Sequence, residues 1–260
     1  MIGANGGRVK RRVRKVWSRA KGATLRKLGQ TPLGTITQVE TDVAAAALTF
    51  DGGPDERWTP QVLDILEGNG ARATFFVTGY YVEKYPSIMR RMVDAGHTVG
   101  NHSWDHPSFP LISGRERREQ IRRCEEALDP YQGGMKLFRP PYLDQDLGSR
   151  LDAARCGYRV ISSSLHARDW EDRSADFMLE SLSNGLTPGS IILLHDAVCD
   201  QRYRSRKEML MMLQAFLAQW SDAYEFVTVP ELMNLGRPIR RPGLKKPNHE
   251  RFATYEKDFY

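Results

Sequence analysis

Short apolar runs alternate with segments of helical periodicity from residue 44 to about residue 235. Seven apolar runs predict strands, at residues 45–50, 71–77, 97–101, 136–139, 158–164, 190–195 and 225–229. Six segments with apolar residues at three- and four-residue steps predict helices, at residues 60–68, 87–95, 114–128, 146–156, 175–184 and 206–220. This alternation is typical of an α/β fold with a parallel sheet. The number of strand-helix units favours a barrel over an open sheet, although periodicity alone does not separate the two.

Two flanks differ from this central region of residues 44–235. In the amino-terminal arm, residues 1–43, apolar positions recur among Arg and Lys from residue 8 to residue 28, which predicts a basic amphipathic helix. Such a helix would either lie on an anionic membrane surface, with Trp17 at the headgroup boundary, or be a partly disordered arm that packs its apolar stripe on the domain. The carboxyl-terminal tail, residues 236–260, is basic and contains several prolines, so it is either an extended strap over the domain or flexible.

The positive charge of the chain is concentrated in the arm. The 260 residues contain 38 Lys and Arg and 32 Asp and Glu, a net charge of +6. Ten of these basic residues and none of the acidic ones lie in the first 30, so the remainder is slightly acidic. A nucleic-acid partner would depend on the arm alone, and none is expected.

The sequence predicts a cytoplasmic location. No apolar run approaches the roughly 18 residues that a membrane span requires, and the first residues lack the apolar centre of a secretory signal. The three cysteines, Cys124, Cys156 and Cys199, are odd in number and lack metal-binding spacing, which is typical of a reduced protein. Residues 8–28 are the candidate for peripheral contact with a membrane.

Polar residues follow five of the predicted strands at the point where each strand ends. In chain order they are Asp51, His102 with His106, Arg139 with Tyr142, Asp169 with Trp170, and His195 with Asp196. Functional groups of α/β sheets and barrels gather at the carboxyl ends of the strands, where loops from several units meet. Any one of these residues has an ordinary explanation as a turn residue, a salt-bridge partner or a hydrogen-bonded histidine. Five such strand ends favour a functional site.

His102 and His106, in the segment NHSWDHP, are four residues apart. One turn of helix would place both imidazoles on one face, which suits a single Zn²⁺ or a similar cation. A divalent ion held by two imidazoles and a carboxylate keeps positions open for water and substrate, as hydrolytic metal sites do. The spacing therefore indicates a hydrolytic metal centre.

Five motifs occur in the order TFDGGP, HSWDH, FRPPY, RDW and LLHD. They resemble the motifs of the polysaccharide deacetylases, carbohydrate esterase family 4, also called the chitooligosaccharide deacetylase homology domain. The resemblance covers about residues 44–232. It implies the family's distorted (β/α) barrel in a single domain, and hydrolysis of the acetamide of N-acetylated amino sugars.

The resemblance also implies roles for the residues that activate water. Asp51 matches the general base, and Arg139 matches the residue that keeps this base ionised and oriented. His102 and His106 match the two histidine ligands of the metal. That metal would be Zn²⁺ in preference to Co²⁺, Mn²⁺ or Ni²⁺.

A second group of matches concerns the substrate and the leaving group. His195 matches the general acid that protonates the departing amine, and Asp169 with Trp170 matches the motif that supports this acid and lines the groove. The backbone N–H of Tyr142 matches the oxyanion donor, and Leu193 matches the wall of the acetyl pocket. Amide hydrolysis requires this acid because an unprotonated amine leaves poorly.

The sequence departs from the family at Gly52. The usual pattern is TFDDGP, whose second aspartate is the third metal ligand. Either the two histidines hold a metal weakly, with water or a carboxylate such as Asp55 or Asp105 in the empty place, or the substrate itself supplies the ligand. Alternatively no metal binds, and the Asp–Arg and His–Asp pairs act on another C–N bond or serve binding only.

Two smaller departures accompany this loss. Leu143 replaces the usual glycine after the tyrosine, and His166 stands four residues before Trp170, where the family often has an aspartate. His166 is interpreted as a solvent-facing residue, with a new metal ligand or an altered acid–base partner as the alternatives.

The resulting prediction is a metal-dependent N-deacetylase that binds its metal less tightly than is usual in the family. A small glycoside, a sugar nucleotide or a lipid-linked sugar is the expected substrate. The alternatives are a metal-independent amidohydrolase and a catalytically inactive member that binds carbohydrate or lipid.

Overall fold

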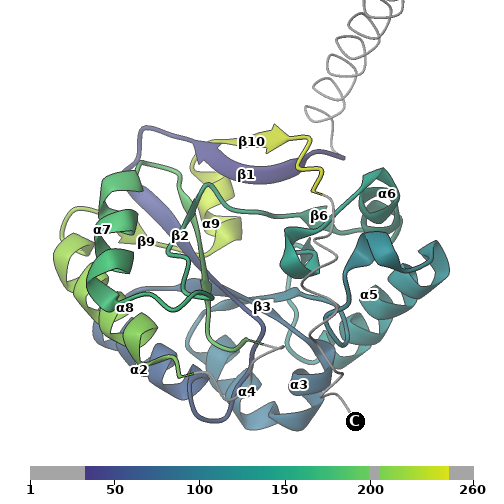
Figure 1. Cartoon of the computed structure of the whole chain (residues 1–260), viewed down its shortest axis with the longest axis horizontal. Coiled ribbons are helices and arrows are strands. Elements are labelled where there is room, and N and C mark those ends of the chain that lie inside the picture. The colour runs from purple at the N-terminus through teal and green to yellow at the C-terminus, as the bar shows by residue number, and fades with distance from the viewer. Residues whose placement is uncertain (1–32, 199–204, 246–260) are drawn as a thin grey trace, which may run out of the picture.

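The computed structural model describes residues 33–198 and 205–245 (Figure 1). Its strands are β1 (Thr35–Glu40), β2 (Ala45–Asp51), β3 (Ala73–Val77), β4 (Thr98–Asn101), β5 (Leu137–Phe138), β6 (Arg159–Val160), β7 (Leu165–His166), β8 (Ile191–His195), β9 (Glu225–Phe226) and β10 (Arg237–Arg241). Its helices are α2 (Thr59–Gly68), α3 (Gly79–Lys84), α4 (Pro86–Asp94), α5 (Gly114–Leu128), α6 (Leu147–Arg155), α7 (Ala175–Gly185), α8 (Lys207–Trp220) and α9 (Val229–Asn234), with short 3₁₀ turns η1 (Phe109–Leu111) and η2 (Pro141–Leu143). None of these helices combines the length and the apolar character needed to span a bilayer.

The main sheet is parallel and is surrounded by helices (Figure 1). Its strand order is β6-β5-β4-β3-β2-β8-β7, and β9 pairs with the start of β2. Strand β1 bridges the β6 side and the β8 side of this sheet. Ile36 forms a bridge with Ile161 just after β6, and Gln38 forms a bridge with Ser190 just before β8. The distorted (β/α) barrel expected from the sequence is confirmed.

Local sequence explains most of these elements. All seven residues of β2 are buried, as expected for a parallel strand that is covered on both faces. Helix α5 begins after a capping box, in which Ser113 and Glu116 each bind the other's backbone N–H. Each of the six predicted helices is present within one residue of its predicted bounds.

Two of the predicted strands are wrong in extent. Of residues 158–164 only Arg159–Val160 form a strand, β6, because the chain then leaves the sheet and Ser162 donates its N–H to the carbonyl of Ile36 in β1; strand β7 begins just beyond the predicted range, at Leu165. Residues 225–229 form only the two-residue strand β9, and helix α9 begins at Val229 after a capping box of Thr228 and Glu231. Helices α3 and α9 and strands β1, β7 and β10 lack counterparts among the predicted elements.

The two flanks of the central region come together in the fold. Strand β1 pairs with β10 in an antiparallel two-stranded sheet, so residues 35–40 and 237–241 belong to the folded unit. The guanidinium of Arg150 in α6 donates to the carbonyls of both Leu33 and Pro242, next to these strands. The tail is an extended strap as far as residue 245. The predicted amphipathic helix of residues 8–28 and the rest of the tail lie outside the described residues.

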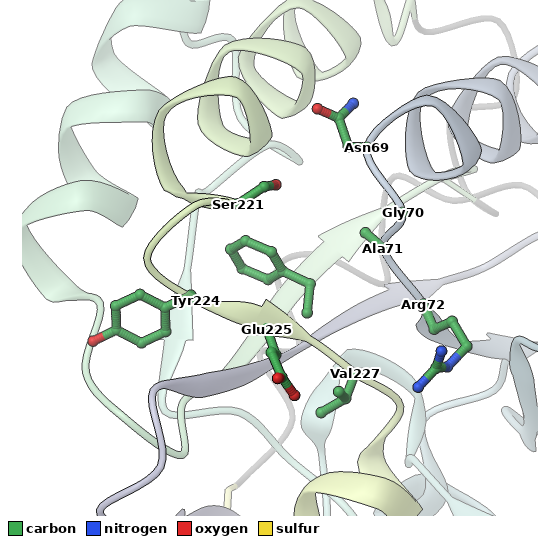
Figure 2. Close-up of a pocket in the computed structure, with 9 residues that line it drawn as sticks. Asn69, Gly70, Ala71, Arg72, Ser221, Tyr224, Glu225 and Val227 are labelled. Carbon is green, nitrogen blue, oxygen red and sulfur yellow. The ribbon is translucent and has the colours of Figure 1, made fainter.

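A pocket of about 220 Å³ opens where the strands begin, at the end of the sheet away from the predicted site (Figure 2). It is lined by the turn of Asn69 to Arg72, which leads into β3, and by Tyr224 and Glu225 around the start of β9. The guanidinium of Arg72 forms an ion pair of 2.7 Å with Glu231. The pocket contains none of the residues that the motifs single out.

His97, just before β4, is expected to make stability depend on pH. Its Nδ1 accepts the N–H of Ala73 at 3.1 Å, and burial lowers its pKa from 6.5 to about 4. The unfolded chain therefore binds the proton first as the pH falls below 6.5, which destabilises the folded state. Between pH 7 and 4.5 the wild type should lose about 2 kcal/mol more unfolding free energy than His97→Asn, whose amide oxygen accepts the same N–H without titrating. Urea unfolding with chelator present measures this, and equal losses would contradict it.

Candidate active site

The residues singled out by the motifs lie at the carboxyl end of the sheet. Asp51 ends β2 and is paired in register with His195, which ends the neighbouring strand β8. His102 directly follows β4, and Arg139 directly follows β5. The structure therefore brings residues separated by up to 144 positions in the chain to one edge of the sheet.

Asp51 and Arg139 form a buried ion pair. The Nη1 of Arg139 donates to Asp51 Oδ1 at 2.6 Å and to the hydroxyl of Thr49 at 2.7 Å, and its Nη2 donates to the carbonyl of Ser162 at 2.9 Å. The side chain of Arg139 is fully buried, with its guanidinium 4.2 Å from the ring centre of Phe76. Burial raises the pKa of Asp51, and the adjacent guanidinium opposes that rise. The arrangement suits a carboxylate that must take up a proton near neutral pH.

His102 is held in the form that can bind a metal. Its Nδ1 lies 2.7 Å from the carbonyl oxygen of Arg139, so this nitrogen carries the proton and Nε2 keeps its lone pair. Nε2 lies 3.9 Å from Asp51 Oδ2. Burial lowers the pKa of His102 to about 3, which keeps the imidazole neutral.

His106 reaches the same place by a different backbone path from the one predicted. The helical turn expected between the two histidines is wrong: His102 to His106 is a loop in which Ser103 and His106 have φ of 74° and 63°. The loop nevertheless places the two imidazole centres 4.9 Å apart. The ring of Tyr142 packs against His106 at 4.5 Å between centres.

The general-acid candidate is supported by a carboxylate. Asp169 accepts two hydrogen bonds from His195, one from the backbone N–H at 2.8 Å and one from Nδ1 at 3.0 Å. Arg206 donates to the carbonyl of Asp169 at 3.1 Å. Burial alone would lower the pKa of His195, but the charge and hydrogen bond of Asp169 raise it above its ordinary value. The imidazole therefore keeps its proton to a higher pH than an ordinary histidine does.

Three further residues line this side of the site. The ring of Trp170 lies edge-on to His195 at 5.6 Å between centres, and the exposed His166 packs on Trp170 at 5.3 Å. Leu193 is buried in β8 and is the register partner of His166 in β7. His166 thus lies beside the site and faces solvent, as predicted.

The two histidines that the resemblance assigns to a metal are one ligand short of a usual catalytic site. Two imidazoles, one of them fixed in the neutral tautomer, have the right chemistry for a borderline divalent ion, but catalytic zinc sites usually have three protein ligands. Within residues 33–198 and 205–245, no group of three or more His, Cys, Asp or Glu side chains has metal-binding geometry. Asp55 does not complete the set, because its Oδ1 accepts the N–H groups of Arg57 and Trp58 and caps the turn before α2.

Comparison with known proteins identifies the family. A sequence model of the polysaccharide deacetylases matches residues 38–161. The chain is 35% identical over 217 residues to a chitin deacetylase of Colletotrichum lindemuthianum, which covers 78% of this chain and 85% of that relative. The chain belongs to the polysaccharide deacetylase family.

Other members of the polysaccharide deacetylase family show how much of the chain the likeness spans. A peptidoglycan N-acetylglucosamine deacetylase of Bacillus cereus is 38% identical over 154 residues, which is 58% of this chain and 56% of the relative. The chain thus spans about half the length of that relative. This chain is also similar to a crystal structure of a peptidoglycan N-acetylglucosamine deacetylase, with 30% sequence identity and a TM-score of 0.70. The likeness covers 79% of this chain and 94% of the chain in that structure.

Sequence reasoning missed the residues that hold the family motifs in place. Thr49 and Ser162 bind Arg139, Arg206 binds Asp169, and Lys245 binds the backbone of Tyr142. Thr49 is two residues before Asp51, the spacing that places two strand residues on one face, and this signal was available in the sequence. The other contacts join distant parts of the chain and have no local signal.

Proposed function

We propose that this protein hydrolyses the N-acetyl group of an amino sugar in a glycan or glycoside, releasing acetate and a free amine. The observation that carries the proposal is the pairing of two polar dyads across neighbouring strands. Asp51 with Arg139 ends β2, and His195 with Asp169 ends β8 at the same register. One dyad is built to accept a proton and the other to donate one, as amide hydrolysis requires.

Asp51 acts as the general base that removes a proton from the attacking water. Arg139 keeps the carboxylate oriented through Oδ1, which leaves Oδ2 on the side of His102 to receive the proton. Burial raises the pKa of Asp51 toward the pH at which a base works best.

His195 acts as the general acid. Its Nδ1 is held by Asp169, so Nε2 carries the proton that passes to the amine as the C–N bond breaks. The raised pKa of His195 keeps this proton in place until it is needed. Trp170, edge-on to the imidazole, forms a flat apolar surface beside it for the sugar ring.

The oxyanion that forms at the acetyl carbon needs a donor and nearby positive charge. The backbone N–H of Tyr142 supplies the donor, and the buried Leu193 forms the wall against the acetyl methyl group. His102 and His106 would hold a divalent metal, which when bound supplies Lewis-acid chemistry at the carbonyl oxygen. Since the protein offers two ligands, we infer that this ion is bound weakly, with Zn²⁺ as the first candidate.

The test is acetate release from a panel of N-acetylated substrates by chelator-treated protein, before and after addition of Zn²⁺ or Co²⁺. The panel contains peptidoglycan fragments and chitooligosaccharides, which the names of the relatives indicate, and small glycosides, sugar nucleotides and lipid-linked sugars. Release that depends on added metal supports the proposal. No release from any substrate with any metal would overturn it.

Gly52→Asp is expected to lower the metal concentration for half-maximal activity at least tenfold. The carboxylate would add the third ligand beside His102 and His106. Gly52 has a φ of 94°, a conformation that other residues adopt with strain, so the variant should also lose about 1–2 kcal/mol of stability. Metal titration of acetate release and urea unfolding measure the two effects.

Gly52→Ala is the matched control for Gly52→Asp. It has the same backbone strain without a ligand, so it should lose stability and leave the half-maximal metal concentration unchanged. Equal metal affinity in all three proteins would show that position 52 does not face the ion.

The second candidate function is carbohydrate binding without turnover. The observation that favours it is Gly52 itself, since the acid–base dyads would remain as binding groups. Retained binding of chitooligosaccharides by the wild type, with no acetate release under any metal, would select this candidate.

A further inference from the structure

Two consecutive residues have a strained backbone in the loop of residues 141–145, here called the oxyanion loop because it contains the Tyr142 N–H. Tyr142 and Leu143 both have φ of 57°, in the left-handed region that favours glycine. A residue with a side chain is strained in this region, and the conformation persists only where surrounding contacts impose it. Glycine would adopt this conformation freely, whereas the Leu143 side chain does not.

Lys245 supplies a contact that reaches this loop. Its Nζ donates to the carbonyl oxygen of Tyr142 at 2.5 Å and lies 3.4 Å from Oδ1 of Asp144. The first contact holds the peptide group between the two strained residues, and the second holds the residue that follows them. Asp144 is buried and also accepts the hydroxyl of Ser108 at 3.1 Å, so the ammonium is anchored to a fixed carboxylate.

The backbone of Lys245 is itself held beside the loop. Lys245 and Gln145 exchange two backbone hydrogen bonds, of 3.0 and 3.1 Å. The amide oxygen of Gln145 accepts the hydroxyl of Thr35 at the start of β1. The strap that continues from β10 is therefore joined to the loop at three residues, Tyr142, Asp144 and Gln145, and to strand β1.

We propose that Lys245 is a positioning residue for the reaction. It acts through Tyr142: by holding the carbonyl side of this residue in the strained conformation, it fixes the direction of the Tyr142 backbone that carries the oxyanion donor. The inference rests on the proposed deacetylase function for its catalytic consequence. It predicts that the carboxyl-terminal strap is required for turnover although it lies outside the five motifs.

The experiment combines Lys245→Met with Leu143→Gly. In Lys245→Met the loop should relax from the strained conformation, so kcat should fall about tenfold with little change in KM, because a misplaced donor weakens the transition state and not the binding of the sugar. In the Leu143→Gly background glycine adopts the conformation without strain, so Lys245→Met should lower kcat by less than about threefold. Lys245→Arg, which keeps a cationic donor, should restore most of kcat.

Arg241→Met is the matched control for Lys245→Met. Arg241 is an exposed cationic residue of the same strap, four positions earlier, and pairs through its backbone with Thr35 in β1. Its substitution should leave kcat and KM unchanged. An equal fall in kcat for both variants, or the same loss from Lys245→Met with and without Leu143→Gly, would overturn the inference.

Amide hydrogen exchange separates this inference from the proposed function. Lys245→Met should speed exchange at residues 142–145 and leave exchange in β2 and β8 unchanged, whether or not a substrate has been found. If the wild type releases no acetate but Lys245→Met speeds exchange at residues 142–145, the proposed function is overturned, and the positioning of Tyr142 by Lys245 is supported. Unchanged exchange at residues 142–145 would overturn the inference even if the wild type is active.

Discussion

Asp51→Asn is expected to lower kcat for acetate release by about 10²–10⁴-fold, the usual contribution of a general base. Asparagine has nearly the same shape, and its amide oxygen still accepts the hydrogen bond from Arg139, so the site should keep its geometry. It cannot take up a proton, which removes the chemical role alone. Burst and steady-state acetate assays with saturating metal measure the loss.

The control for Asp51→Asn is Asp64→Asn. Asp64 is an exposed acid of α2 that forms an ion pair with Arg91 away from the site, and its substitution should leave kcat unchanged. Circular dichroism should show both variants folded, with a lower midpoint for Asp51→Asn because Arg139 loses its counter-charge. Activity of Asp51→Asn within threefold of the wild type would remove Asp51 from the role of base.

Arg139→Met is expected to cost about 3–5 kcal/mol of unfolding free energy, the usual penalty for leaving one charge of a buried pair without its partner. The variant also loses the hydrogen bonds to Thr49 and Ser162. Without the guanidinium, burial raises the pKa of Asp51 further, so the remaining activity should appear only at higher pH. Urea unfolding and the pH dependence of kcat/KM measure the two effects.

Two further variants test whether this cost comes from the unpaired charge. Asp51→Asn combined with Arg139→Met should be more stable than the sum of the single losses predicts, because neither charge is then buried alone. Arg150→Met removes another fully buried arginine, whose hydrogen bonds within the described residues all go to carbonyl groups, and should lose stability without moving the pH profile. Additive losses in the double variant would show that Asp51 and Arg139 are not coupled.

Six of the helices in the described residues were predictable because their signals are local. Apolar spacing and the capping residues Ser113 and Glu116 define α5 within one stretch of chain. The extents of the short strands were harder to predict. Only a few residues of each apolar run pair with a neighbouring strand, and the other residues of the run form hydrogen bonds elsewhere. Ser162 and Ser164 show this directly: their N–H groups bind Ile36 of β1 and Ile191 of β8, from opposite parts of the chain.

The sequence singled out the residues of the candidate site and part of their geometry. The rule that functional groups follow parallel strands placed Asp51 and His195 together, and their register in β2 and β8 agrees with it. The same reasoning failed for the loop from His102 to His106, where a four-residue spacing indicated a helical turn. Ser103 and His106 have positive φ, and the spacing of the two histidines does not indicate this.

The sequence by itself determined the alternation of strands and helices, the family and the residue types of the site, since periodicity and ordered motifs are properties of neighbouring residues. Only the tertiary structure decided that the two flanks pair as β1 and β10, that Asp55 caps a turn instead of completing a metal site, and that Lys245 reaches the loop of Tyr142. These contacts join residues up to about 200 positions apart. Their energies depend on distance and burial in the folded chain, and a linear pattern contains neither.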